Sequence, residues 1–147
     1  MKVCIVSSCG GHLTEVRCLK SVYDAYEHFY VLNDNAILPE DMKDKTYFIT
    51  HSERDLRFFI NLWEAFKIIR RERPDVILST GAGPVVPFAI LARLLSRTLV
   101  IYIEPMTQVV SSSLTGRIMH HLAHHFFYQW ESLAHLFPKG KYGGTLI

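Results

Sequence analysis

The sequence has little cysteine and no long uninterrupted hydrophobic run. Its longest apolar stretch, residues 84–95, is interrupted by Pro87 and Arg93, and it is shorter than the roughly 20 residues that a membrane-spanning helix needs. The apolar run near the start holds about five residues before the glycines, whereas the core of a signal peptide needs about 7–15. We therefore expect neither a spanning helix nor a signal peptide.

Cysteine occurs only at Cys4, Cys9 and Cys18. An odd number of cysteines crowded near the amino end does not form a disulfide framework, and their spacing matches no zinc motif. This usage is typical of a reduced, cytosolic compartment.

A strong charge imbalance is also absent, because 16 Lys and Arg face 14 Asp and Glu and leave a formal net charge of +2. Such a charge does not by itself indicate nucleic acid as a partner. Hydrophobic residues make up 49% and charged residues 20% of the chain, which excludes disorder and suits a packed α/β core. With 147 residues and no linker or repeat, the sequence predicts a single domain over residues 1–147.

Short apolar segments alternate with helical patterns almost to the end of the chain. We expect strands at residues 3–7, 28–32, 47–50, 75–78, 98–103 and 125–129, and helices at residues 14–26, 54–73, 85–95 and 113–123. Thr14 is the expected N-cap of the first helix, and Ser52 or Asp55 that of the long helix, which Pro74 closes. This alternation predicts an α/β fold, a Rossmann-like parallel sheet with helices on both faces.

Two turns of small residues follow the first and fourth expected strands, at residues 7–12 and 79–84. In a parallel sheet both turns lie at the carboxyl edge, where ligands bind. Their backbone amides and the positive end of a helix dipole favour a phosphate or diphosphate group. The alternative is purely geometric, because every connection from a strand to a helix needs small residues.

Six motifs in chain order resemble a known family. They lie at residues 7–15, 79–87, 101–105, 113–117, 126–130 and 142–144. Together they are similar to the polysaccharide-biosynthesis family of bacterial PssD/CpsF-type proteins, a relative of the membrane-anchoring subunit of the split eukaryotic UDP-GlcNAc transferase. The resemblance runs from residue 2 to residue 144, and it implies the fold of the acceptor-side, N-terminal half of MurG-type GT-B glycosyltransferases.

The resemblance implies the acceptor-binding, membrane-recruiting subunit of a two-component glycosyltransferase in capsular or exopolysaccharide synthesis. Such a subunit holds a polyprenyl-diphosphate-linked glycan, while a separate donor-binding subunit holds most of the UDP-sugar. It has little transferase activity alone, uses no cofactor or metal, and binds no nucleic acid. We expect it in the cytoplasm, attached peripherally to the inner face of the plasma membrane, whereas eukaryotic relatives carry an amino-terminal membrane anchor.

The same resemblance suggests roles for residues of both turns and of the fifth strand. The acceptor diphosphate is expected to contact Ser8, Gly10, Gly11, Thr80, Gly81 and Gly83. His12 matches the histidine of the first glycine loop in MurG-like enzymes and is a candidate catalytic base or positioning group; alternatively, it caps the helix. Glu104 is a candidate to hydrogen-bond the acceptor sugar; alternatively, its carboxylate binds neighbouring backbone amides.

The long helix carries an apolar arc wider than the roughly 100° needed to pack on one face of a sheet. Its narrow polar stripe consists of Arg57, Asn61, Glu64, Lys67 and Arg71. The helix is either deeply buried in the core or in contact with the membrane surface or a partner. In the second case, the contact residues are Phe58, Trp63, Lys67, Arg70 and Arg71.

Three further alternatives concern metal, scaffolding and dinucleotides. His120, His121, His124 and His125 form two i, i+4 pairs that can bind metal from one helical face, but nothing identifies a third ligand, and we expect a solvated or packed cluster. A non-catalytic scaffold that docks the catalytic subunit to the membrane is a rival function. A small dinucleotide-binding Rossmann enzyme is another, although the first turn offers only an adjacent glycine pair, with Asp34 about where a ribose-binding acid falls.

Overall fold

A computed structural model describes residues 1–33, 38–50 and 56–147 of the chain. Asp34, for which the sequence suggested a ribose contact, and Ser52 and Asp55, the expected helix caps, lie outside these ranges. Within the described ranges, no helix is both long and apolar enough to cross a bilayer.

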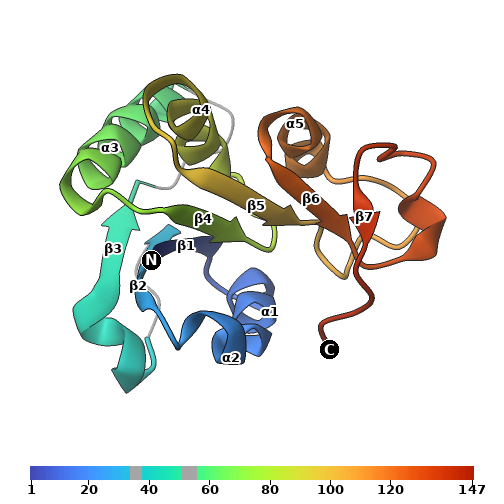
Figure 1. Cartoon of the computed structure of the whole chain (residues 1–147), viewed down its shortest axis with the longest axis horizontal. Helices are drawn as coiled ribbons and strands as arrows, with labels where there is room; N and C mark the ends of the chain where they lie inside the picture. Colours follow the sequence, from blue (N-terminus) through green and yellow to red (C-terminus); the bar gives the residue numbers. More distant parts are fainter. Residues whose placement is uncertain (34–37, 51–55) are drawn as a thin grey trace.

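A parallel sheet forms the centre of the molecule, with strand order β3-β2-β1-β4-β5-β6-β7 (Figure 1). The strands are β1 (Lys2–Ser8), β2 (Glu27–Asn33), β3 (Thr46–Ile49), β4 (Val76–Ser79), β5 (Leu99–Ile103), β6 (His125–Tyr128) and β7 (Lys141–Tyr142). The Rossmann-like α/β prediction is confirmed. The two-residue strand β7 was not predicted, because it lies in an exposed glycine-rich segment without an apolar run.

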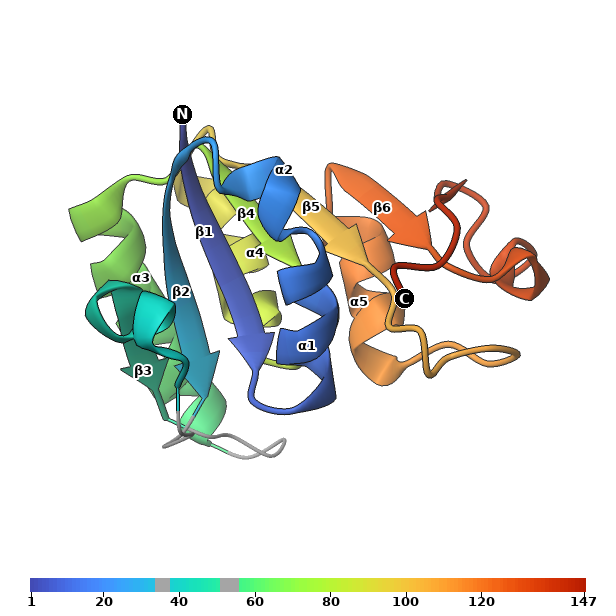
Figure 2. The same ribbon diagram turned by 90° about the horizontal axis from the view of Figure 1, so that it is seen from below.

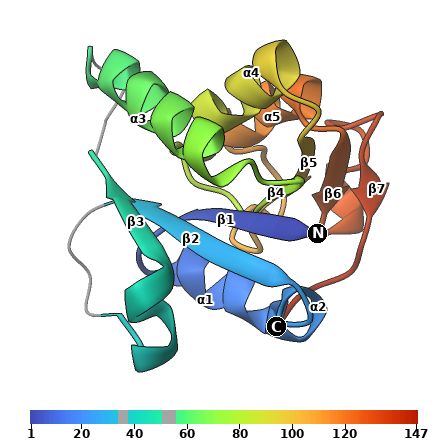
Figure 3. The same cartoon turned by 60° about the vertical axis from the view of Figure 1, so that its left-hand side comes forward.

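Helices cover both faces of this sheet. The helices are α1 (Gly11–Cys18), α2 (Lys20–Tyr23), α3 (Arg57–Glu72), α4 (Val85–Leu95) and α5 (Leu114–Leu122), with 3₁₀ turns at Glu40–Lys45 and Glu131–Leu133. Figures 1 and 3 show α3, α4 and α5 on one face of the sheet and α1 with α2 on the other. The connections through α4 and α5 step along the sheet from β4 to β6, whereas the connection through α1 and α2 steps the opposite way, from β1 to β2. Opposite steps place helices on opposite faces when crossovers are right-handed.

The first helical region differs from the prediction of one helix over residues 14–26. The helix begins three residues earlier, directly after Gly10, whose φ of 98° sets the turn out of β1. It stops at Cys18, and Leu19 separates it from α2. Thr14 is therefore inside α1 rather than at its N-cap, and His12 belongs to the first helical turn. Figure 2 shows α1 starting at the edge to which β1 and β2 point.

The core divides into two layers because successive strand residues face opposite sides of the sheet. Cys4 and Val6 of β1 pack with the layer under α3, α4 and α5. Val3 and Ile5 pack with the layer under α1 and α2. Burial raises the pKa of the Cys4 thiol, which marks this cysteine as a packed core residue rather than a reactive one.

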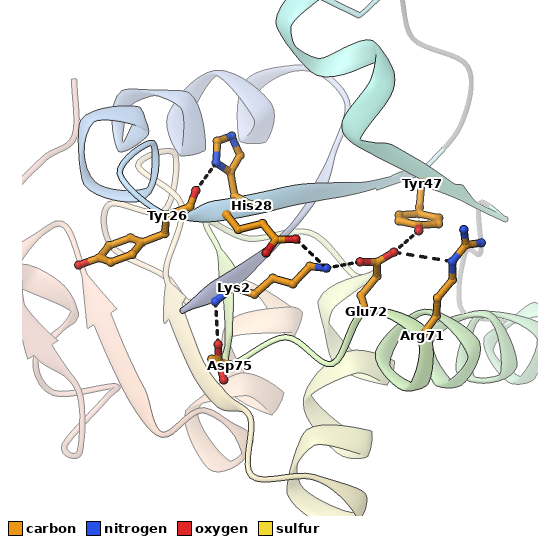
Figure 4. Close-up of polar contacts among 8 residues, drawn as sticks. Lys2, Tyr26, His28, Tyr47, Arg71, Glu72 and Asp75 are labelled. Atoms are coloured by element: carbon orange, nitrogen blue, oxygen red, sulfur yellow. Dashed lines mark hydrogen bonds and ion pairs between the residues drawn. The ribbon is translucent and has the colours of Figure 1, made fainter.

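A polar cluster fastens the end of α3 to the sheet (Figure 4). The Lys2 ammonium lies 2.5 Å from a Glu72 oxygen and 3.0 Å from a Glu27 oxygen, and Tyr47 donates its hydroxyl hydrogen to Glu72. The pKa of Lys2 is raised and that of Glu72 lowered, chiefly by their hydrogen bond to each other. The Lys2 amide also donates to an Asp75 oxygen at 2.7 Å. This cluster lies at the amino end of β1, away from the glycine turns.

Candidate functional site

A cleft of about 320 Å³ lies at the carboxyl edge of the sheet. Both glycine turns and the connection between β5 and α5 contribute to its walls. It is lined by Ser8, His12, Asn33, Ala82, Gly83, Pro84, Pro105, Thr107, Gln108, Ser113 and Thr115. Of the residues named from sequence, the structure places Ser8, His12 and Gly83 in this lining. It adds polar side chains that sequence patterns did not single out, above all Thr107, Gln108 and Thr115.

His12 and Thr80 join the two glycine turns directly. The His12 Nδ1 atom lies 3.0 Å from the Thr80 carbonyl oxygen, and the Thr80 hydroxyl donates to the His12 carbonyl oxygen at 2.9 Å. Because a carbonyl oxygen only accepts hydrogen bonds, the first contact assigns the hydrogen to Nδ1. In the neutral ring, Nε2 is then the nitrogen that can accept a proton. The side chain lines the cleft and is half-buried.

Gly81 permits this approach of the two turns. Its φ is +107°, and a Cβ atom built on it would lie 2.7 Å from His12 ring atoms and 3.1 Å from Pro105. Contacts below 3.0 Å to a fixed ring force a displacement. Thr80 and Gly81 are both buried. These two residues therefore support His12 on its buried side. In contrast, Gly10, Gly11 and Gly83 are exposed.

Helix amino termini face the cleft from different sides. Neither α1, which follows Gly10, nor α4, which follows Pro84, has a side-chain capping hydrogen bond. In contrast, the Ser113 hydroxyl caps α5 by accepting from the Gly116 amide at 2.8 Å. The uncapped amides of α1 and the dipoles of α1 and α4 favour an anion. At the start of α4 the Val85 and Val86 amides already donate to the Ala82 and Gly83 carbonyls, so this helix contributes mainly its dipole. No lysine or arginine is present in the lining given above, so backbone amides and dipoles dominate this attraction.

Glu104 is fully buried at the end of β5 and is not one of the residues that line the cleft. Its carboxylate accepts from the Ser113 amide at 2.6 Å, from the Ser113 hydroxyl at 3.1 Å and from the Tyr102 hydroxyl at 3.2 Å. Desolvation raises the pKa of this carboxyl, and the bonds from Ser113 oppose that rise. These contacts match the alternative of a carboxylate that binds neighbouring amides.

Gly116 explains how the carboxylate fits beside the helix. A Cβ atom at this position would lie 2.0 Å from Glu104 Oε2, so that only glycine leaves room for the acid. The Glu104 carbonyl oxygen in turn accepts from Gln129 Nε2 at 3.0 Å. Glu104 thus positions Ser113, which does line the cleft, together with the start of α5.

The outer surface of α3 combines exposed apolar and basic side chains. We define the α3 surface as Leu56, Phe59, Ile60, Trp63, Lys67, Arg70 and Arg71, all exposed. Phe59 and Trp63 are 66% and 58% exposed, and the Lys67 ammonium lies 5.4 Å from the Trp63 ring centre. The apolar members occupy the amino-terminal half and the basic members the other half. Phe58 differs from the expected contact residues in being half-buried.

The opposite face of α3 packs on the core, but the structure does not match the alternative of a deeply buried helix. The helix is not buried all round, because only Asn61, Ala65, Ile68 and Ile69 are buried. The polar stripe is partly buried, since Asn61 is 2% exposed. Glu64, another member of that stripe, accepts from the Thr50 amide and hydroxyl at 3.0 Å each.

A larger groove of about 610 Å³ lies at the other end of the strands, between the carboxyl ends of α3 and α4. Arg70 lines it, together with Arg73, Asp75, Leu95 and Arg97. It contains none of the residues expected to bind a diphosphate. The basic side chains there lie near two helix carboxyl termini, where cations offset the negative end of the dipole.

The histidine cluster is part of the packing around α5 and β6. His120 packs edge-on against Phe126, with ring centres 5.3 Å apart, and His124 Nδ1 accepts from the Val100 amide at 3.0 Å. Burial lowers the pKa of both rings. In the part of the chain that the structure describes, no three His, Cys, Asp or Glu side chains are grouped as metal ligands.

Comparison with known proteins gives a consistent family match. A family model described as "Oligosaccharide biosynthesis protein Alg14 like" matches residues 45–146. The "UDP-N-acetylglucosamine transferase subunit ALG14" of Homo sapiens is 26% identical, over 100% of this chain and 83% of that protein. The mouse protein of the same name is 28% identical over the same shares. A Candida albicans protein of that name is 38% identical over 52% of this chain and 37% of its own length.

Solved structures show the same fold. The crystal structure of Acinetobacter baumannii MurG matches 100% of this chain with a TM-score of 0.78 and 16% identity. A UDP-GlcNAc 2-epimerase from Methanocaldococcus jannaschii matches 95% of the chain with a TM-score of 0.71 and 14% identity. The chain spans less than half of either structure, 46% and 42% respectively. Its seven-stranded sheet thus corresponds to one half of a MurG-like GT-B fold.

Proposed function

This chain belongs to the family of Alg14-like oligosaccharide biosynthesis proteins, and we propose that it is the acceptor-binding, membrane-recruiting subunit of a two-component glycosyltransferase. A donor-binding partner subunit holds most of the UDP-sugar, and residues 1–147 form the acceptor-side domain. The proposal is supported by the human and mouse relatives, both named as subunits of a UDP-N-acetylglucosamine transferase. We extend the same proposal to a bacterial setting of the PssD/CpsF type, in capsular or exopolysaccharide synthesis.

The observation that carries this proposal is the cleft between two uncapped helix amino termini with His12 in its wall. A diphosphate needs several hydrogen-bond donors, which the amides around Gly11 and Gly83 supply together with the Ser8 hydroxyl. The positive ends of the α1 and α4 dipoles stabilise its charge without a metal ion. Together with the family resemblance, this supports a polyprenyl-diphosphate-linked sugar as the ligand class.

In the transfer step, an acceptor hydroxyl oxygen forms a bond to the anomeric carbon of the donor sugar. The bond between that carbon and the UDP oxygen breaks, and its electron pair leaves with UDP. His12 Nε2 takes the hydroxyl proton, because Nδ1 is occupied by the Thr80 carbonyl. Glu104 is a positioning residue in this scheme, acting through Ser113 and the start of α5.

We assign membrane recruitment to the α3 surface. Its aromatic and aliphatic side chains suit the boundary of acyl chains and headgroups, and its basic half suits anionic lipids. Attachment through this surface is peripheral and on the inner face of the plasma membrane. The donor-binding partner binds this chain so that its donor sugar faces the carboxyl edge of the sheet.

Binding of inorganic pyrophosphate and of a short-chain isoprenoid diphosphate–N-acetylglucosamine, followed by amide chemical shifts, tests this assignment. We expect both ligands to shift the amides of Gly11, Gly83 and their neighbours, with the sugar-linked ligand also shifting residues 107 and 108. Shifts confined to other surfaces, or none at millimolar ligand, would overturn the acceptor site. The chain would then be a scaffold that docks its catalytic partner to the membrane.

A further inference from the structure

Glu15 is a buried acid beside the cleft that the proposed reaction does not use. It lies on α1, three residues after His12, and is 5% exposed. Its Oε1 atom accepts a hydrogen bond of 2.7 Å from the Met106 amide, which lies 91 residues further along the chain. An acid on the first helix therefore holds the connection between β5 and α5.

Met106 is held from its other side as well. Its carbonyl oxygen accepts from Trp130 Nε1 at 2.7 Å, so both backbone groups of this residue are fixed by side chains from separate elements. Its neighbours Pro105, Thr107 and Gln108 line the cleft, and the Gln108 amide donates to the Pro105 carbonyl at 3.0 Å. Fixing Met106 thus fixes the part of the wall that contains Thr107 and Gln108.

The second carboxyl oxygen of Glu15 shows that the hydrogen bond to Met106 is maintained at a cost in folding stability. Oε2 is buried and has no hydrogen-bond partner among the described residues. Desolvation raises the pKa of Glu15, and the Met106 bond opposes the rise. An unpartnered buried oxygen lowers stability, so the Met106 hydrogen bond is kept at a cost that packing alone does not require.

We propose that Glu15 is a positioning residue of the acceptor cleft, which holds the Met106 amide and so sets Thr107 and Gln108 at the distance from His12 that the acceptor sugar requires. This inference rests on the proposed function, because it assigns the wall residues to acceptor recognition. It predicts an effect on acceptor binding rather than on the chemical step.

The test uses three variants of the full chain. Glu15→Ala removes the acceptor of the Met106 hydrogen bond, and Glu15→Gln keeps an oxygen acceptor of the same reach. Trp130→Phe removes the donor to the Met106 carbonyl and keeps an aromatic ring at that position. Amide hydrogen exchange of residues 106–108 is measured on the chain alone. The KM for the isoprenoid diphosphate sugar and kcat are measured on each variant paired with the donor-binding subunit.

We expect Glu15→Ala to speed exchange of these amides roughly tenfold, the usual effect of losing one hydrogen bond. The KM of Glu15→Ala for the acceptor should rise by a similar factor, with kcat nearly unchanged. Glu15→Gln should restore both the exchange rates and the KM. Trp130→Phe should shift the exchange rates and the KM in the same direction as Glu15→Ala. Unchanged exchange, or a fall in kcat at constant KM, would overturn the positioning role.

The two proposals fail in different ways. If the wild-type pair transfers no sugar, the proposed function fails. The exchange rates of residues 106–108 still decide whether Glu15 fixes this part of the cleft wall. The affinity of each variant for pyrophosphate then decides whether fixing the wall affects ligand binding. If wild-type transfer is normal and Glu15→Ala changes neither KM nor exchange, only the inference on Glu15 fails. Should Glu15→Ala not fold, as judged by its circular dichroism and melting, Trp130→Phe carries the same decision.

Discussion

His12 and Thr80 exchange two hydrogen bonds across 68 residues of sequence, His12 Nδ1 with the Thr80 carbonyl and the Thr80 hydroxyl with the His12 carbonyl. This pairing turns two separate glycine turns into one wall of a cleft. It also selects the ring nitrogen that remains available to a substrate. The chemistry proposed for His12 therefore depends on Thr80, which does not itself line the cleft.

Replacing Thr80 by valine should weaken that arrangement without removing it. Thr80→Val keeps the carbonyl that holds Nδ1 but loses the hydroxyl bond to the His12 carbonyl. We expect a loss of about 1 kcal/mol of unfolding free energy, measured by urea titration. Thr80→Ser is the matched control, because it retains the hydroxyl; equal losses in both variants would show that the hydroxyl bond is unimportant.

The two glycines of the second turn should respond differently to alanine. Gly81→Ala forces a positive φ on alanine and a contact of 2.7 Å with the His12 ring, so it should cost about 1–3 kcal/mol of stability and displace the histidine. Gly83→Ala meets no protein atom within 4 Å yet lines the cleft. It should leave the melting temperature almost unchanged and weaken pyrophosphate binding. The assignment of the cleft is wrong if Gly83→Ala binds pyrophosphate as the wild type does.

Glu104 should make the protein less stable as the pH rises. Burial raises its pKa in the folded state above the ordinary value of 4.5, so the folded protein binds the proton more tightly than the unfolded chain. That contribution is complete below about pH 4.5 and is lost as the pH rises through the folded-state pKa. Glu104→Gln should therefore flatten the fall in unfolding free energy above pH 4.5. Parallel pH profiles of the two proteins would contradict the raised pKa.

The α3 surface should bind anionic vesicles through both of its halves. Trp63→Ser should weaken binding to phosphatidylglycerol vesicles at all salt concentrations, because it removes apolar contact area. Lys67→Gln and Arg71→Gln should each weaken binding by about 1 kcal/mol at low salt, with smaller effects at high salt. Val22→Ser changes an equally exposed residue, at 62%, on the other face of the sheet. The assignment fails if Val22→Ser and Trp63→Ser have equal effects.

Much of the fold could be predicted because its elements are local patterns. Short β-branched runs separated by helical periodicity indicated a parallel sheet, and Pro74 marked the end of α3, where Arg73 has a φ of 47°. The break between α1 and α2 was missed, because nothing in the helical pattern around Leu19 signals it. Strand β7 was missed because two exposed residues carry no periodicity.

The site was less predictable because its walls meet only in three dimensions. The glycine turns and His12 were identified from sequence, since small residues after a strand are a local signal. Thr107 and Gln108 sit in a connection without a motif of their own. Their place in the cleft depends on contacts between distant segments, such as the hydrogen bonds of Met106 with Glu15 and Trp130. For Glu104, contact with the acceptor sugar requires an exposed carboxylate, and binding of neighbouring amides allows a buried one. The sequence around Glu104 does not specify which of the two applies.

Sugar transfer by the reconstituted pair tests the central claim most directly. The initial rate from UDP-N-acetylglucosamine to a short-chain isoprenoid diphosphate–N-acetylglucosamine is measured for this chain, for its donor-binding subunit and for the two together, with His12→Ala in parallel. We predict transfer only by the pair, and a loss of at least about 100-fold with His12→Ala while the two subunits still co-purify. Transfer by this chain alone at the rate of the pair, or full activity of the His12→Ala pair, would contradict the account.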